Sequence, residues 1–173
     1  MKYRIIQLSL ILFVIAGSFL VAVAQGFPYG DFERRTLQDL VKINEQEDSE
    51  DLKRFPDQSQ FVFRGKTLPS VVRLTYIGES RPLGAERKKF IELWATSYYR
   101  NPGYANLYEA EFLFKEGITE YWLPVQKQVA KYFDGELKKS ELVDLYLIRP
   151  GGLRVKGKID WIFLVEEFQQ PRD

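Results

Sequence analysis

The side chains that could carry acid–base chemistry in this sequence are carboxylates. The chain has no histidine and no cysteine, which excludes a Ser-His-Asp triad, a cysteine nucleophile, a disulfide and a Cys/His zinc site. Glu109 and Glu111 lie two residues apart on the same face of a predicted strand, about 6.5–7 Å apart at Cα. Glu120 lies on the next strand. Such carboxylates could serve a hydrolase acting on a polysaccharide, which we keep as an alternative. Because alternation of polar and apolar residues is typical of a strand with one solvated face, we expect that the protein has no catalytic site and is not an enzyme.

An acidic run at residues 44–51 raises the question of a metal site. Carboxylates are the ligands that calcium prefers, but the run lacks the glycine and the alternating ligand spacing of an EF-hand loop. We therefore expect a solvated linker and no metal. No GxGxxG, P-loop or other cofactor signature occurs in the chain, so we also expect no cofactor.

Aromatic residues make up 15% of the chain and include the first candidate binding residue, Trp122. If Tyr121, Leu123 and Val125 point into the core, Trp122 lies on the outer face of its strand together with Glu120. An outward tryptophan is a candidate platform for a sugar ring or a partner protein. The alternative is that Trp122 packs beneath a helix.

A basic segment near the C-terminus supplies the other candidate binding residues. Arg149, Arg154, Lys156 and Lys158 fall within ten residues, interspersed with glycines. A basic, glycine-bearing loop can contact phosphates or carboxylates. The alternative is an exposed hairpin whose charges keep a sheet edge soluble.

The periodicity of apolar residues predicts the elements that position these side chains. The predicted order is a strand at 71–78, a helix at 84–99, a hairpin of strands 107–115 and 119–125, a helix at 125–133, a strand at 142–148, a turn at 149–152 and a strand at 158–168. The helix at 84–99 has one apolar face, formed by Phe90, Leu93, Trp94, Ser97 and Tyr98.

This order predicts an α+β fold: a small antiparallel, OB-like five-stranded barrel or bent sheet with two helices. The helix at 84–99 would be inserted after the first strand, and the basic segment would be the loop between strands four and five, which commonly lines the ligand groove of OB folds. A plain antiparallel sheet with both helices on one face is the alternative.

The N-terminus predicts export. Lys2 and Arg4 precede an uncharged apolar run that ends in Ala22-Val23-Ala24, the pattern of a signal peptide spanning 1–24 and cut before Gln25. The alternative is an uncleaved anchor, since the run approaches the length of a membrane span. We divide the remainder into an N-terminal extension with the acidic linker, 25–60, and a single domain, 61–173.

Charge narrows the class of partner. The chain has 25 Lys+Arg and 24 Asp+Glu, so we expect no nucleic acid partner. Removing residues 1–24 takes away two basic residues and no acidic one, which turns the formal charge from +1 to −1. The sequence predicts a periplasmic or secreted, non-catalytic binding module of the bacterial envelope, whose partner is an envelope protein or an anionic glycan. An N-terminally anchored structural subunit, with the membrane as partner, is the alternative if the segment stays uncleaved.

Overall fold

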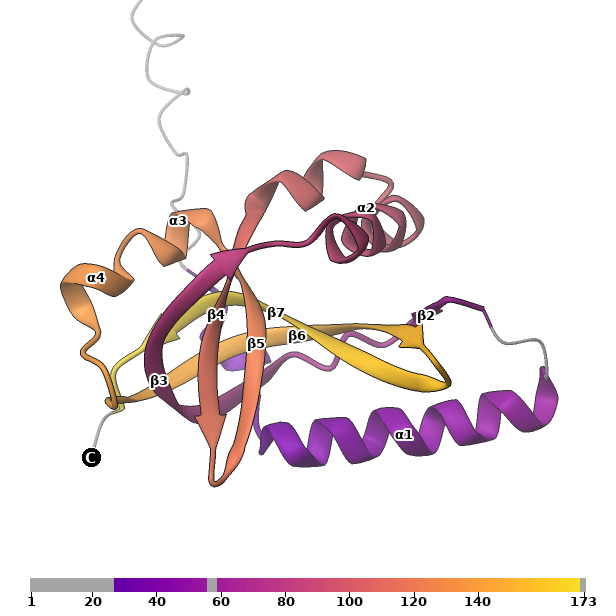
Figure 1. Ribbon diagram of the computed structural model, residues 1–173, viewed down its shortest axis with the longest axis horizontal. Coiled ribbons are helices and arrows are strands. Elements are labelled where there is room, and N and C mark those ends of the chain that lie inside the picture. The colour runs from indigo at the N-terminus through magenta and orange to yellow at the C-terminus, as the bar shows by residue number, and fades with distance from the viewer. Residues whose placement is uncertain (1–26, 56–58, 172–173) are drawn as a thin grey trace, which may run out of the picture.

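The computed structural model describes residues 27–55 and 59–171, so the predicted signal peptide lies outside the described residues. The chain forms a mixed α+β structure around a seven-stranded sheet (Figure 1). The strands are β1 Glu33–Arg34, β2 Phe61–Phe63, β3 Ser70–Pro82, β4 Tyr108–Glu116, β5 Thr119–Gln126, β6 Leu142–Val155 and β7 Lys158–Gln169. The helices are α1 Leu37–Arg54, α2 Ala85–Tyr99, α3 Lys127–Ala130 and α4 Phe133–Glu136, with 3-10 turns at Tyr29–Asp31 and Pro102–Leu107.

Five of the strands pair in a circuit. β3 pairs with β4, β4 with β5 and β6 with β7, all antiparallel. β5 pairs in parallel with β7 where Val125 faces Val165. β6 then returns to pair with β3, so that the pairings run through β3, β4, β5, β7 and β6 and back to β3.

The turn of the last hairpin differs from the prediction. Lys156 and Gly157 both have positive φ, 50° and 79°, the conformation that a two-residue turn between β6 and β7 requires. The segment 149–152, predicted as the turn, instead lies inside β6 at a register shift. Gly151 explains why: its φ is +133°, and a Cβ there would be 1.8 Å from the carbonyl oxygen of Val62. The Gly151 backbone therefore allows β2 to lie against β6.

Residues 44–51 are not a linker. They lie within α1, which continues to Arg54, so the prediction of a solvated linker is wrong. Thr36 caps the start of the helix, accepting a hydrogen bond from the Asp39 amide at 3.0 Å. Glu116, at the end of β4, accepts further hydrogen bonds from the amides of Leu37 and Gln38 at 2.8 and 2.9 Å. The carboxylate satisfies two amides that a helix start leaves without partners.

Two clusters of buried apolar side chains fill the fold. The first joins the strands of the circuit to the first half of α1, through residues such as Leu40, Phe114 and Phe163. The second lies beneath α2. There the predicted face of the helix is partly wrong: Leu93 and Tyr98 are exposed. The side chains that α2 buries are Phe90, Ile91, Trp94 and Ala95.

The predicted helix at 125–133 also differs from the structure. β5 continues to Gln126, and two single-turn helices, α3 and α4, follow it. No helix within residues 27–55 and 59–171 is long and apolar enough to cross a membrane.

Candidate functional site

Two of the four predicted basic binding residues are held inside the fold. The Arg149 side chain is 1% exposed. Its guanidinium donates to both carboxylate oxygens of Glu47, at 2.7 and 2.8 Å, and to Asn44 Oδ1 at 2.6 Å. Arg154 donates to Asp48 at 2.8 Å. Both arginines therefore have a structural role, because they bind side chains of α1. Their role in binding a ligand stays a prediction.

Arg64 joins them and was missed by the sequence interpretation. Its buried guanidinium donates to Asp51 at 2.7 Å and to the Asn44 carbonyl at 3.0 Å. Arg64, Arg149 and Arg154 form what we call the arginine cluster, which holds the second half of α1. The hydrogen bond from Arg149 lowers the pKa of Glu47. The signal was the helical spacing of α1's side chains in the cluster, Asn44, Glu47, Asp48 and Asp51.

A cleft of about 690 Å³ opens between the second half of α1 and the β6–β7 hairpin. Figure 1 shows α1 running along this hairpin. The ion pair between Asp48 and Arg154 joins the two walls. The α1 wall consists of Glu45, Asp48, Ser49, Leu52 and Lys53, and the hairpin wall of Arg154, Gly157, Lys158, Ile159 and Trp161.

Trp161 is the large aromatic side chain of the hairpin wall, and two contacts define its position. On β6, Gly152 lies opposite Trp161. A Cβ at Gly152 would be 3.0 Å from Trp161 Cε3 and 2.6 Å from Ile159 Cγ2, so the missing side chain leaves room for both. The Arg64 guanidinium carbon lies 5.3 Å from the centroid of the indole, within the range of a cation–π contact.

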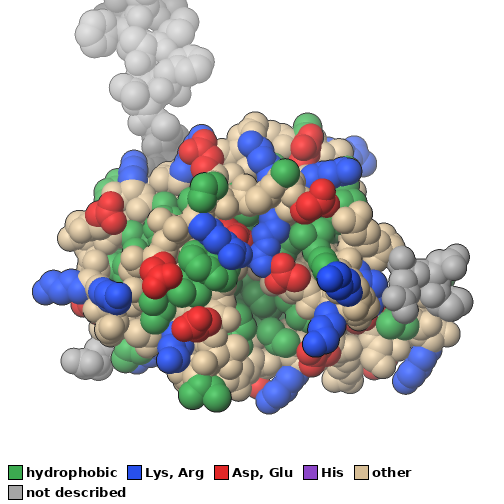
Figure 2. Space-filling view, viewed as in Figure 1, with side chains coloured by type: hydrophobic (Ala, Val, Ile, Leu, Met, Phe, Trp, Pro, Cys, Tyr) green, Lys and Arg blue, Asp and Glu red, His purple; other side chains and the backbone are tan. Residues whose placement is uncertain are grey.

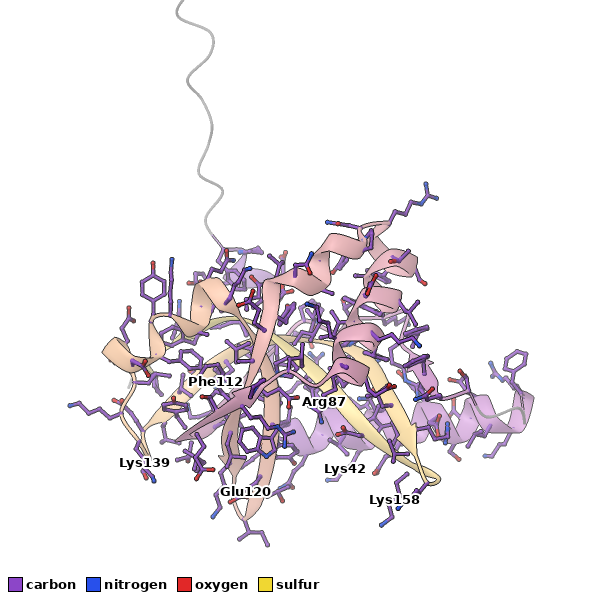
Figure 3. The ribbon with its side chains drawn as sticks, turned by 45° about the horizontal axis from the view of Figure 1, so that its top comes forward. Lys42, Arg87, Phe112, Glu120, Lys139 and Lys158 are labelled. Carbon is purple, nitrogen blue, oxygen red and sulfur yellow. The ribbon has the colours of Figure 1, made fainter. Side chains whose placement is uncertain are left out.

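The other two predicted basic residues are lysines at the tip of the β6–β7 hairpin. Lys156 lies in the turn and Lys158 begins β7, and both are exposed. Figure 3 shows Lys158 at the end of the β6–β7 hairpin and Glu120 near the end of the β4–β5 hairpin. The structure therefore places the predicted binding residues on two different hairpins, and only Arg154 and Lys158 line the cleft.

Trp122 is half-buried and lies on the face of β5 opposite the first core cluster. Tyr121, Leu123 and Val125 pack in the first core cluster, which leaves Trp122 and Glu120 on the opposite face of the strand. The Arg81 guanidinium carbon lies 4.2 Å from the centroid of the Trp122 ring. Arg81 therefore covers part of the proposed platform, and a ligand stacking there on the same ring face would have to displace it.

The three carboxylates of the hydrolase alternative do not meet in one cleft. On the β4–β5 hairpin, Glu111 faces Pro124 and Glu120 faces Lys115. Glu111 and Glu120 are thus separated by four residues along the hairpin, or about 13 Å at the usual rise per residue. That exceeds the separations used by glycosidases, about 5–9.5 Å.

Glu109 and Glu111 are also engaged by cations. Glu109 is exposed and accepts a hydrogen bond from Lys127 at 3.0 Å. Glu111 is 1% exposed; one oxygen accepts from Arg81 at 2.7 Å and the other from Arg87. Arg87 also donates to the Trp122 carbonyl at 3.1 Å and, with its other terminal nitrogen, to Asp160 of β7.

Figure 2 shows basic and acidic side chains gathered at the centre of this face, between β5 and α2. A second polar cluster, in which Tyr104 donates to the half-buried Glu166, lies beside α2. Burial raises the pKa of Glu166. Within the described parts of the chain, no three His, Cys, Asp or Glu side chains are grouped so that they could hold a metal ion.

Comparisons of the chain with models of protein families, with curated proteins and with solved structures found no match. Its function therefore has to be inferred from the geometry of its own residues.

Proposed function

We propose that the protein is an exported, non-catalytic binding module of the bacterial envelope, which holds an envelope protein or an anionic glycan beside the β6–β7 hairpin. The observation that carries this proposal is the cleft of about 690 Å³ along the hairpin, bordered by Lys53 and Lys158 on opposite walls. A cleft of this size, with apolar side chains and a few polar groups that converge on it, is typical of a ligand site.

We also propose that the five-strand circuit is an OB-like barrel, with α2 inserted after its first strand. The order β3-β4-β5-β7-β6, with short helices between the third and fourth strands in the chain, supports it. In OB folds the loop between strands four and five lines the ligand groove. Here that loop is the turn at Lys156 and Gly157, next to the cleft.

Binding is favoured over catalysis by the state of the carboxylates. A general acid or base needs an oxygen within reach of a substrate. Both oxygens of Glu111 accept hydrogen bonds from arginines beneath a covered surface, and Glu120 is exposed at the end of a hairpin. No observation in the described chain favours the hydrolase over the binding module.

The test is recovery of envelope components by the immobilised full chain. We would compare wild type, K156A/K158A and the control K138A/K139A, whose lysines are exposed near the start of β6. The tip variant is preferred over changes at Arg149 and Arg154, because those arginines hold α1. Loss of a recovered component with K156A/K158A alone is the expected result. Identical recovery by all three proteins would contradict the proposal.

Export has its own test. The mass of the protein recovered from the envelope or medium is expected to correspond to a chain that begins at Gln25. An intact N-terminus would contradict cleavage and favour the anchored subunit.

A further inference from the structure

We infer that the cleft between the second half of α1 and the β6–β7 hairpin is a site for a short oligosaccharide that carries carboxylates. The inference rests on the proposed binding function and specifies its ligand. It also adds residues that the sequence interpretation did not select, above all Lys53 and Trp161.

The charges of the cleft favour an anionic ligand. Asp48 and Arg154 form an ion pair at 2.8 Å and neutralise each other. Of the remaining charged lining residues, Lys53 and Lys158 are basic and Glu45 is acidic. All three are exposed, and the two lysines lie on opposite walls, so that a ligand in the cleft meets an ammonium group on each side. Carboxylates spaced along a chain of sugars fit such a pair of cations.

The other lining residues suit sugar rings. Trp161, Ile159 and Leu52 supply apolar surface, against which the C–H face of a sugar ring can pack. Glu45 and Ser49 supply oxygen atoms that accept hydrogen bonds from hydroxyl groups. A few polar groups set among apolar side chains are typical of small-ligand sites. A carboxylated sugar would use the apolar surface, the hydrogen-bond acceptors and the ammonium groups of the lysines.

The walls are held before any ligand arrives. The guanidinium carbon of Arg64 lies 5.3 Å from the centroid of the Trp161 ring, and the Arg64 side chain is 5% exposed. Gly152 leaves the space that Trp161 and Ile159 need. On the other wall, the arginine cluster holds the helix that carries Glu45, Ser49 and Lys53. Preorganised walls reduce the entropy that binding costs.

The size of the cleft favours a glycan over a folded protein. Its volume of about 690 Å³ lies in the range of small-ligand sites, about 300–1,000 Å³. A stable protein–protein interface needs about 800 Å² on each partner, for which a cleft of this kind would supply only a part. A protein partner that contacts the hairpin tip without filling the cleft is the competing outcome.

The test is titration of the full chain with trigalacturonate, with maltotriose as the uncharged probe of equal length, followed by calorimetry. We expect binding of the acidic trisaccharide only, weakened about 5- to 30-fold in K53A/K158A, which corresponds to about 1–2 kcal/mol for two exposed ion pairs together. The control K138A/K139A is expected to bind like wild type. Tryptophan fluorescence should change on binding, and W161F should lose most of that change.

The results separate this inference from the proposed function. If trigalacturonate does not bind, or binds equally well to K53A/K158A, the inference is wrong. If K156A/K158A still loses an envelope component in that case, the proposed function stands without it. If neither the trisaccharide nor any envelope component depends on the hairpin lysines, both are wrong. The lysine variants change only exposed side chains, so circular dichroism like that of wild type is expected from each.

Discussion

Arg149 and Glu47, 102 residues apart in the chain, are joined by two hydrogen bonds of 2.7 and 2.8 Å. The pair connects the middle of α1 to β6. Because Arg149 is buried, the protein has to supply the partners that water would otherwise provide. Glu47, together with Asn44, does so, and the position of the α1 wall of the cleft follows from that pairing.

Loss of the Glu47 carboxylate is expected to destabilise the fold. E47A leaves the Arg149 guanidinium with Asn44 as its remaining side-chain partner. Breaking a buried ion pair costs about 3–5 kcal/mol; since Glu47 is itself partly exposed, we expect about 2–4 kcal/mol. Urea unfolding followed by circular dichroism measures it. E45A changes an exposed residue of the same helix and should cost less than about 0.5 kcal/mol; an equal loss in both variants would show that the pair contributes nothing specific.

Asp144 predicts how stability depends on pH. It accepts two hydrogen bonds from Arg73, at 2.8 and 3.0 Å, and two from Arg34. These arginines lower the pKa of Asp144 to about 2, and the hydrogen bonds from Arg73 have the largest effect. Because its pKa is lower in the folded protein than in the unfolded chain, Asp144 stabilises the fold above pH ~4, and this contribution is lost as the pH falls toward ~2.

The corresponding measurement is the free energy of unfolding in urea at pH 7, 4 and 2, for wild type and D144N. Wild type should lose about 1–2 kcal/mol more than D144N between pH 4 and pH 2, an amount limited by the exposure of both arginines. Glu47, whose pKa is also lowered, contributes in the same direction in both proteins, so the difference isolates Asp144. Parallel curves would mean that the Asp144 pKa is not lowered.

Local pattern predicted the elements whose partners are close in sequence. The predicted hairpin of strands 107–115 and 119–125 agrees with β4 and β5 to within one residue at each end. Its alternation also separated Trp122 from Tyr121, Leu123 and Val125, which pack in the first core cluster. By contrast, residues 44–51 have no apolar residue and resemble a solvated run. They form a helix whose polar side chains bind Arg64, Arg149 and Arg154. Those arginines are far away in the sequence, so the local pattern of residues 44–51 could not predict the pairs.

The candidate site shows the same division. Charge and spacing selected Lys158 and Arg154, which line the cleft. Lys53 and Trp161 were not, because the cleft exists only where α1 passes the hairpin, and that passage depends on tertiary ion pairs. The glycines at 151 and 152 were interpreted as a turn; their role is to admit the Val62 carbonyl and the Trp161 ring, which depends on neighbours far away in sequence.

Arg87 is expected to stabilise the fold by joining α2 to the sheet. It is bound to Glu111, to the Trp122 carbonyl and to Asp160, so it connects α2 to β4, β5 and β7. R87A leaves the buried Glu111 with Arg81 alone and should cost about 2–4 kcal/mol. K88A changes the neighbouring exposed residue and serves as the control. If chemical denaturation gave the same midpoint for R87A and K88A, the bridge would have no structural importance.

Gly152 offers a test of the hairpin wall itself. Its φ is not in the left-handed region, so the cost of G152A arises from crowding: the new Cβ would meet Ile159 Cγ2 at 2.6 Å and the Asp160 carbonyl oxygen at 2.7 Å. Because a backbone oxygen cannot move aside alone, β7 has to shift relative to β6, at a cost of about 1–3 kcal/mol.

The matched control is G65A, where a Cβ would meet nothing within 4 Å. We expect G152A to unfold at lower urea concentration than G65A and its tryptophan emission to change in the folded state, because Trp161 Cε3 lies 3.0 Å from the added carbon. Equal midpoints and identical spectra for the two variants would mean that Trp161 does not depend on the space above Gly152.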